Sequence, residues 1–334
     1  MLIPGQTPRV RNVRSVALSN VFVGALLLVV SACGSSTPDT VSPPSPIGTV
    51  LTTADFPASL AVAPEGSLYI GELATGRIIK FEASLQGPPS TVATLPVTAG
   101  GGFEKQVGLT GLTVSPTGRL FAAWMRSSDD HMVVSEVVDG SPRDVWVGPA
   151  SAQQASAGRL VWWRDRLVIS IGDRLIGADP DPPLDDLRSA IITLDPDQPS
   201  SQVPAIVSTN WNNPFALTVD ASDRLLVADN VPGGGPERFG ASVDLGQTML
   251  SDLGSDSEHV APSGLAEALT GKVWICGWIS QVVTEVPVGA DGTADWAARS
   301  RRDDIPCSLD VVRLPDGRMV VSTDSDVRVV PARA

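Results

Sequence analysis

The 334-residue sequence has few of the residue types on which common catalytic sites depend. It contains two histidines, three cysteines and one tyrosine. It has no serine-nucleophile motif, no Walker-type phosphate loop and no Cys-x-x-Cys pair. These absences argue against a serine hydrolase, a P-loop nucleotide hydrolase and a dithiol oxidoreductase. His131 and His259 lie between predicted strands, where a surface position is favoured over a catalytic one.

No apolar run is long enough to cross a bilayer. The longest candidate, Val21–Val30, holds ten residues and follows three arginines, as the core of a signal peptide does. It ends in Val30-Ser31-Ala32-Cys33, which resembles a bacterial lipobox, whose cysteine receives a diacylglycerol and becomes the mature N-terminus. The sequence therefore predicts a lipoprotein signal peptide over residues 1–32 and lipidation of Cys33. An ordinary secretory signal with a chance cysteine is the alternative.

Basic charge is also scarce. The formal net charge is −13, and removal of residues 1–32, which hold three arginines and no acids, takes it to −13 − 3 = −16. Such a surface repels nucleic acid and anionic lipid headgroups. Residues 33–46 are rich in proline and serine and predict a solvated tether. We expect a monomer anchored to the cell membrane by lipid on its extracytoplasmic side.

Helical periodicity is absent from most of the mature chain, whereas one strand-rich pattern recurs six times. Each copy has an alternating apolar run, a turn and a second β-rich run, with a third strand in the fullest copies. The six turns, at Gly66, Gly118, Asp165, Asp223, Gly271 and Gly317, are spaced by 52, 47, 58, 48 and 46 residues. This is close to the length of a propeller blade. Residues 47–334 are therefore predicted to form an all-β, six-bladed β-propeller.

The last copy predicts how the ring closes. It contains three strands before the chain stops, whereas the β-prone segment Gly48–Thr53 precedes the first copy. Because a propeller must close its ring, we expect this N-terminal segment to become the outer strand of the last blade.

Four motifs occur in an order typical of one family. They are Tyr69-Ile70-Gly71-Glu72 with Thr75-Gly76-Arg77-Ile78, Gln106-Val107-Gly108-Leu109, Gly158-Arg159-Leu160 with Gly172-Asp173, and Asn213-Pro214-Phe215. Together they resemble the glucose/sorbosone dehydrogenase family, soluble six-bladed propellers that oxidise aldoses with pyrroloquinoline quinone (PQQ) and calcium. The organisation of the chain is also similar to that of degenerate actinobacterial lipoproteins of this family.

The resemblance fails at the residues that carry the chemistry. Ala155 stands where the family has its catalytic histidine, and alanine accepts no proton. Asp173 matches the acid that orients this histidine. The family holds the three carboxylates of PQQ with cations, but the matching positions here are Asn212, Cys307 and Leu309. The resemblance thus implies a propeller without PQQ catalysis.

The ends of the second strands should meet at one face of a propeller, in a mouth. Carboxylates are common there, which predicts an oxygen-lined site for calcium or a polar ligand, with Trp211 and Trp278 as stacking platforms. The favoured alternative is that these acids cap the turns that follow them. Trp146, Trp162, Trp163 and Trp274 are instead predicted to be core residues. The candidate pocket comprises Glu72, Asp173, Trp211, Asn212, Asp229, Asn230, Trp278 and Asp324.

Two cysteines remain once Cys33 is assigned to lipid. Cys276 ends the second strand of the fifth blade and Cys307 precedes the innermost strand of the sixth, so both lie on the same face of adjacent blades. In an oxidising compartment this predicts a disulfide. Two separate buried thiols are the alternative.

Three functions remain open. The first is a non-catalytic binding module whose mouth takes a protein, a glycan or a small ligand, with no cofactor. The second is a PQQ- and calcium-dependent aldose sugar dehydrogenase. The third is a calcium-dependent lactonase with Glu72, Asn230 and Asp324 as metal ligands.

Overall fold

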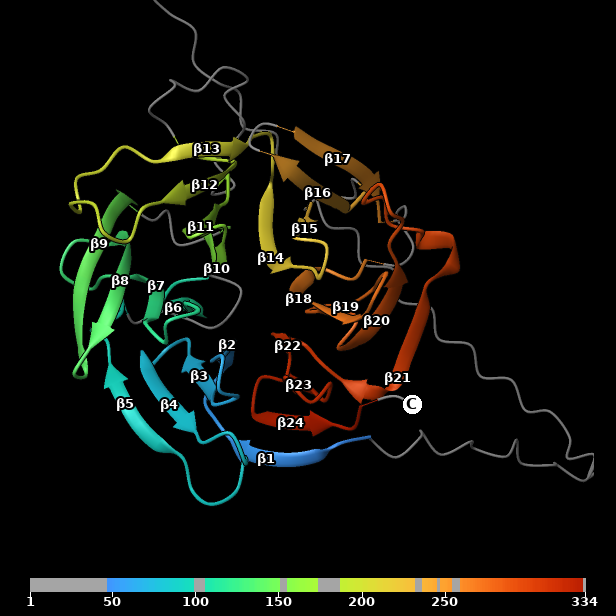
Figure 1. Cartoon of the computed structure of the whole chain (residues 1–334), viewed down its shortest axis with the longest axis horizontal. Helices are drawn as coiled ribbons and strands as arrows, with labels where there is room; N and C mark the ends of the chain where they lie inside the picture. Colours follow the sequence, from blue (N-terminus) through green and yellow to red (C-terminus); the bar gives the residue numbers. More distant parts are fainter. Residues whose placement is uncertain are drawn as a thin grey trace, which may run out of the picture. The chain divides into compact units, whose positions relative to one another are not determined.

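The computed structural model describes residues 47–98, 106–150, 155–173, 187–231, 236–244, 247–253 and 259–332. These residues all belong to one compact unit. They form six four-stranded antiparallel sheets arranged around an axis, as Figure 1 shows. Within them, no helix has the length and apolar character needed to cross a membrane. The predicted six-bladed β-propeller is confirmed.

Five blades are each built from four consecutive strands, with the innermost strand first. Blade 1 comprises β2 (Pro57–Val62), β3 (Leu68–Glu72), β4 (Arg77–Phe81) and β5 (Ser90–Thr94). Blade 2 comprises β6 (Leu109–Val114), β7 (Leu120–Met125), β8 (His131–Val138) and β9 (Ser141–Ala150). Blade 3 comprises β10 (Ala157–Trp163), β11 (Arg166–Ile171), β12 (Ala190–Leu194) and β13 (Ala205–Ser208). Blade 4 comprises β14 (Asn213–Val219), β15 (Leu225–Asn230), β16 (Arg238–Asp244) and β17 (Gln247–Asp252). Blade 5 comprises β18 (Pro262–Leu269), β19 (Lys272–Gly277), β20 (Val282–Pro287) and β21 (Ser300–Pro306).

Blade 6 is assembled from both ends of the propeller sequence. Its strands are β22 (Val311–Arg313), β23 (Met319–Ser322), β24 (Asp326–Val330) and β1 (Thr49–Thr53), in that order from the axis outwards. Thr49 pairs with Val329 and Thr53 with Asp326 in an antiparallel ladder. The predicted closure of the last blade by the N-terminal strand is therefore confirmed.

Local chemistry explains the hairpins between first and second strands. In blade 1 the turn Pro64-Glu65-Gly66 places Gly66 at φ +96°, a conformation that favours glycine.

The innermost strands also approach one another closely near the axis. A Cβ on Gly111 of blade 2 would lie 2.4 Å from the carbonyl oxygen of Gly158 in blade 3, so the packing of these two strands requires glycine.

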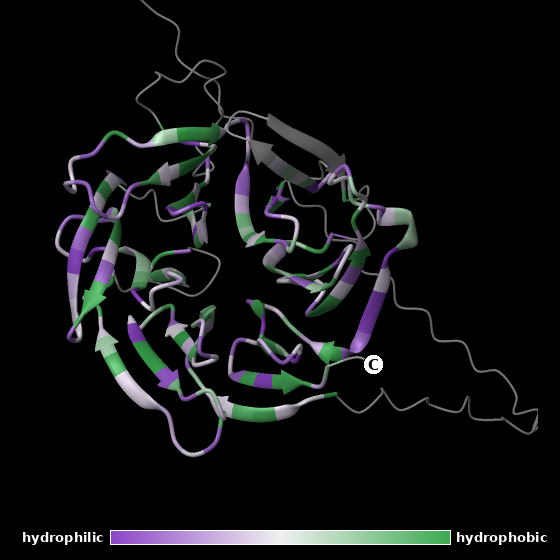
Figure 2. Cartoon of the chain, in the orientation of Figure 1, coloured by the Kyte–Doolittle hydropathy of each residue, from purple (hydrophilic) through white to green (hydrophobic). Residues whose placement is uncertain are grey.

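The hydrophobic core lies between the blades. Apolar faces of neighbouring sheets pack together, and the largest fully buried side chains include Trp124, Trp274 and Phe121. Of the four tryptophans predicted to be core residues, Trp146, Trp163 and Trp274 are buried and Trp162 packs partly buried against the core. The outer strand β21 is hydrophilic along most of its length, as Figure 2 shows. Its charges protect an exposed sheet edge from pairing with other chains.

Candidate functional site

The starts of the innermost strands and the ends of the second strands lie at the same face, which we call the mouth. In blade 1, Pro57 at the start of β2 pairs with Glu72 at the end of β3. In blade 4, Asn213 pairs with Asn230 in the same way. The register thus places the predicted ring of strand ends at the mouth. The members of this ring differ in burial: Glu72, Trp124, Asp229 and Cys276 are buried, Asp173 and Asn230 are half-buried, and Asp324 is exposed.

The Glu72 carboxylate is buried and forms hydrogen bonds with neighbouring groups of the protein. Its side chain is 1% exposed and accepts hydrogen bonds from Thr75 Oγ1 (2.7 Å), Arg77 Nε (2.9 Å) and the backbone N–H of Asp55 (3.3 Å). Burial alone would raise the pKa of Glu72, but the hydrogen bonds from Arg77, Thr75 and Asp55 outweigh it and lower this pKa. Glu72 is therefore a charged group that holds the β3–β4 turn.

Asp229 has a comparable role in blade 4. It is fully buried and accepts hydrogen bonds from the backbone N–H groups of Asn212 (3.1 Å) and Asn213 (2.7 Å) and from Arg238 Nε (3.0 Å). Burial raises the pKa of Asp229, although Arg238 and the two N–H groups oppose that shift. The prediction of an open acidic mouth is thus corrected for Glu72 and Asp229, because buried carboxylates need partners and these two have them within the protein.

Ala155 and Asp173 lie together, as the resemblance implies. A Cβ on Gly172 would lie 1.8 Å from the Ala155 carbonyl oxygen, so only glycine fits beside Ala155. The side chain of Asp173 accepts a hydrogen bond from Asn212 Nδ2, and its backbone N–H donates to the Asn212 carbonyl oxygen at 2.7 Å. The acid and the residue at the family's arginine position therefore bind each other. Within the described residues, Asn212 Oδ1 is buried without a hydrogen-bond partner.

Cys276 and Cys307 form the predicted disulfide. Their Cα atoms are 5.1 Å apart, within the usual window of about 4.4 to 6.8 Å, and both residues are fully buried. The bond links β19 of blade 5 to the segment that leads into β22 of blade 6. The position at which the family keeps a cofactor-binding cation thus holds a crosslink.

Apolar side chains close the channel beneath the mouth. This axial cluster consists of Ala58, Leu73, Ala157, Phe215 and Leu309, all buried. Phe56 and Trp278 are partly buried and pack against it. Leu309, at the second of the family's cation positions in this region, is fully buried in the cluster. The channel therefore presents hydrocarbon where the resemblance would place a charged clamp.

Arg159 lies directly below the axial cluster and connects all six blades. Its guanidinium stacks on Phe215 at 4.3 Å and donates to the carbonyl oxygens of Phe215 (3.0 Å) and Leu309 (2.9 Å). It also contacts Asp310 Oδ2 at 3.3 Å. Its remaining acceptors are the carbonyl oxygens of Ala58, Thr110 and Ser263. This role was not predicted from the sequence, although a charged residue within an apolar innermost strand was the available signal.

The two tryptophans proposed as stacking platforms differ. Trp211 is 3% exposed, packs between blades 3 and 4, and donates from Nε1 to Ser208 Oγ at 2.8 Å. Its prediction as a ligand platform is wrong, because the indole faces are covered by the core. Trp278 is half-buried beside the axial cluster, and its predicted role stays a prediction.

The residues suggested as calcium ligands do not form an evident metal centre. Both carboxylate oxygens of Glu72 are engaged by Arg77 and Thr75, and Asp324 is exposed in a turn. In the part of the chain that the structure describes, no three His, Cys, Asp or Glu side chains gather in a way that could hold a metal ion. Asn230 lies at the mouth opposite Asn213.

The mouth residues do not fit PQQ. Three carboxylates need fixed cations, yet Asn212, Cys307 and Leu309 are neutral. Arg77 and Arg238, which begin the third strands of blades 1 and 4, are paired with Glu72 and Asp229. Their charge is therefore already balanced by buried carboxylates.

The predictions for the N-terminal segment lie outside the described residues. These are the signal peptide over residues 1–32, the lipidation of Cys33 and the tether over residues 33–46.

No protein-family model and no curated protein matches the sequence. Solved structures do match. A protein from Thermus thermophilus assigned as an oxidoreductase (glucose dehydrogenase) has 21% identity and a TM-score of 0.68, covering 85% of this chain and 98% of its own. The PQQ-bound aldose sugar dehydrogenase of Streptomyces coelicolor has 19% identity and a TM-score of 0.66, covering 86% and 99%.

A gluconolactonase from Xanthomonas campestris is similar at lower identity, 14%, with a TM-score of 0.58 and coverage of 84% of this chain and 88% of its own. At such identities the likeness establishes architecture. The chain therefore has the six-bladed propeller fold that PQQ-dependent sugar dehydrogenases use.

Proposed function

We propose that this protein is a lipid-anchored extracytoplasmic lipoprotein whose propeller acts as a binding module and does not catalyse PQQ-dependent sugar oxidation. One observation supports the part of the proposal that concerns the absence of PQQ catalysis. The positions that the resemblance assigns to the base and to two cofactor-binding cations are a buried alanine, a disulfide cysteine and a buried leucine, namely Ala155, Cys307 and Leu309.

Each of these residues has a structural environment that opposes the lost chemistry. Ala155 is 5% exposed and has φ +44°, so a longer side chain there would meet both burial and backbone strain. Cys307 is consumed by its bond to Cys276. Leu309 packs in the axial cluster, where an unpaired cation would carry a large desolvation penalty. The side chains at these positions therefore favour a closed channel over a cofactor site.

Because apolar side chains form the floor of the mouth, the mouth favours a partner with a hydrocarbon or aromatic surface. Phe56 and Trp278 pack on the axial cluster and remain partly exposed. A protein loop, a glycan with an apolar sugar face or a small ligand would each supply such a surface. Binding there requires neither calcium nor PQQ.

The dehydrogenase alternative is favoured by the likeness to PQQ-bound enzymes and by the retained Asp173. Calorimetry separates the two functions. The protein covering residues 47–334 is titrated with PQQ in the presence of calcium, with the Streptomyces coelicolor aldose sugar dehydrogenase as the positive control. We expect no saturable heat, no spectral change of the quinone and no aldose oxidation with an artificial electron acceptor.

The Ala155→His variant should also remain inactive, because a restored base does not supply the missing cations. Turnover of aldoses by the unmodified protein at ordinary enzyme rates would overturn the proposal.

Anchoring is tested separately. Cys33→Ser should release the protein from the membrane fraction into the medium or periplasm, because the thiol that carries the lipid is gone. Membrane association that persists in this variant would contradict the lipoprotein assignment while leaving the binding-module proposal intact.

A further inference from the structure

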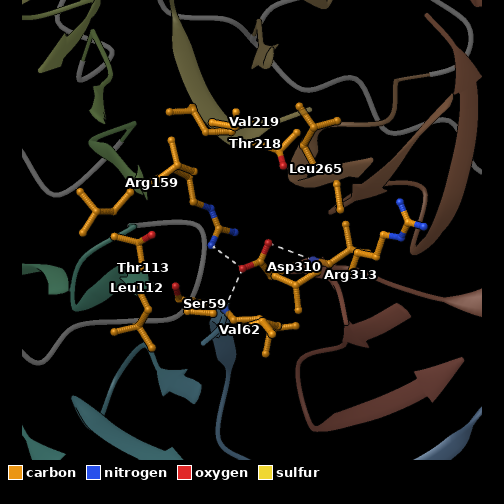
Figure 3. A pocket seen from close by; sticks show the side chains of 18 of the residues that line it. Ser59, Val62, Leu112, Thr113, Arg159, Thr218, Val219, Leu265, Asp310 and Arg313 are labelled. Carbon is orange, nitrogen blue, oxygen red and sulfur yellow. Dashed lines mark hydrogen bonds and ion pairs between the residues drawn. The ribbon is translucent and has the colours of Figure 1, made fainter. Parts of the chain in front are cut away.

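Below Arg159 the channel widens into a cavity of about 280 Å³, which we call the cup (Figure 3). It is lined by the innermost strands of all six blades. Val62, one of its lining residues, pairs with Leu68 at the hairpin end of blade 1. The cup therefore lies on the side of Arg159 that faces away from the mouth. Glu267 and the exposed Arg313 stand among its lining residues and mark its solvent side.

Three hydroxyl groups line the cup without partners. They belong to Ser59, Thr113 and Thr218, from blades 1, 2 and 4, and Figure 3 shows the three side chains around the cavity. Ser59 is 1% exposed and Thr113 is 8% exposed. Within the described part of the chain, none of these hydroxyls makes a hydrogen bond to protein. These oxygens are reached from the cavity rather than sealed in the core, so an occupant of the cup can bond to them.

The floor of the cup offers an acceptor and no free donor. Asp310 Oδ2 accepts from the Leu60 N–H (2.8 Å) and Arg159, whereas Oδ1 accepts from the Val311 N–H alone (2.9 Å). Because a carboxylate oxygen accepts about two hydrogen bonds, Oδ1 retains capacity. The Nε and both Nη atoms of Arg159 already donate to protein oxygens. Arg159 also balances the charge of Asp310.

These features select the chemistry of the occupant. At the floor of the cup, an anion would find no uncommitted donor on Arg159, and a cation would meet an Asp310 carboxylate that Arg159 already compensates. On the solvent side, the lining residues Arg313 and Glu267 carry opposite charges. A neutral molecule with several hydroxyls can donate to Asp310 and exchange hydrogen bonds with Ser59 and the two threonines. Its C–H groups would contact the lining residues Leu112, Val219 and Leu265.

The cavity volume limits the size of this molecule. At about 280 Å³ the cup is slightly below the range of about 300 to 1,000 Å³ that is typical for drug-sized ligands. We propose that the cup is a second binding site, distinct from the mouth, for a small neutral polyol or a single monosaccharide. The axial cluster and Arg159 separate it from the mouth, so this site does not depend on the function proposed above.

Titration calorimetry of the full chain, in a buffer free of glycerol and sugar-based detergent, tests the site. Xylitol, myo-inositol and D-glucose are the neutral probes, and D-gluconate and D-glucosamine are the charged ones. We expect at least one neutral probe to bind with a Kd on the order of 1 mM, as suits a small ligand. Both charged probes should bind more weakly than D-glucose.

Variants locate the binding. Thr113→Val and Thr218→Val keep the β-branched shape and remove one hydroxyl, so each should weaken binding roughly threefold to tenfold. Thr113→Ser should retain affinity. The matched control is Thr91→Val, because Thr91 is exposed on the outer strand β5.

The proposal is overturned if no neutral probe binds at concentrations up to about 100 mM, which would leave the cup as a water-filled channel. It is also overturned if Thr113→Val and Thr218→Val bind like the unmodified protein, or if D-gluconate binds most tightly. Should Thr113→Val fail to fold, Thr113→Ser and Thr218→Val decide the result. None of these outcomes depends on whether PQQ binds at the mouth.

Discussion

Blade 2 and blade 6 achieve the same four-stranded form by different means. Blade 2 is one continuous stretch whose strands β6 to β9 contain six, six, eight and ten residues. Blade 6 combines the two ends of the propeller sequence, and β22, β23, β24 and β1 contain three, four, five and five residues. Shorter strands make fewer ladder hydrogen bonds and bury less apolar surface.

The blade with the shorter strands carries the specific crosslinks. Cys307 bonds blade 6 to blade 5, and Asp310 receives hydrogen bonds from Leu60 of blade 1 and Arg159 of blade 3. Blade 2 instead relies on long strands and on buried aromatic residues such as Phe121 and Trp124. The comparison indicates that blade 2 is stabilised by the length of its strands and the apolar area they bury, whereas the composite blade 6 depends on a few non-local bonds. Four predictions test this difference, from the largest expected effect to the smallest.

Removal of residues 47–54 should have the largest effect. The deletion takes β1 from blade 6 and leaves β24 as an unpaired edge, which favours unfolding or aggregation. Thermal unfolding and size-exclusion chromatography should show loss of the folded monomer. Deletion of residues 34–44 is the control and should leave the Tm unchanged. Equal behaviour of the two truncations would contradict the role of β1 in closure.

Asp310→Asn should be the most damaging single substitution in blade 6. It leaves the buried Arg159 guanidinium without its carboxylate, and breaking a buried ion pair from one side costs about 3 to 5 kcal/mol. Thr110→Val is the matched change in blade 2, where the Thr110 hydroxyl contacts the Ala123 and Gly158 carbonyl oxygens at 3.3 Å. Its expected cost is about 1 kcal/mol. Chemical denaturation measures both, and equal costs would remove the distinction between the blades.

Loss of the disulfide should cost less than loss of the strand. The bond closes a loop with a sequence separation of 31, for which chain entropy suggests about 3 to 4 kcal/mol. Replacement of Cys276 and Cys307 by alanine should lower the denaturation midpoint by a corresponding amount. Alkylation under denaturing, non-reducing conditions, followed by intact mass measurement, provides the direct check. Two alkylated thiols in the unmodified domain would show that the crosslink does not form.

Glu136→Gln in blade 2 should have the smallest effect, and one that depends on pH. Hydrogen bonds from Arg119 lower the pKa of Glu136 against the opposing effect of burial, and Arg143 adds to them. A carboxyl with a lowered folded-state pKa stabilises the fold above its unfolded pKa of about 4.3 and loses that contribution as the pH falls through the folded value. Because Arg119 and Arg143 are partly exposed, we expect a difference of only about 1 kcal/mol at pH 7.

Urea denaturation of Glu136→Gln and the unmodified protein at pH 7 and below about pH 4 measures this difference, which should shrink at the lower pH. A difference that is constant across this range would mean that Glu136 acts by packing rather than by charge.

Much of the architecture was predictable because its signals are local. The turn at Pro64-Glu65-Gly66 and its counterparts marked the blades, and Gly48–Thr53 was a strand without a neighbour in sequence. The pairing of Cys276 with Cys307 followed from their number and their blade positions. Trp211 was misplaced because a residue beside a strand end can face either the mouth or the adjacent blade, and blade packing selects between them.

The sequence by itself therefore determined the number of blades, the closing strand and the disulfide, since turn dihedrals and strand alternation are set by a few adjacent residues. Only the tertiary structure decided which polar groups are hydrogen-bonded within the protein and which remain able to bind a ligand. Arg159 bonds to Asp310, 151 positions away, and to backbone carbonyl oxygens from all five of the other blades. These groups converge only once the ring is closed. The same convergence makes the cup beneath Arg159, because its lining is contributed by six strands that are distant in the chain.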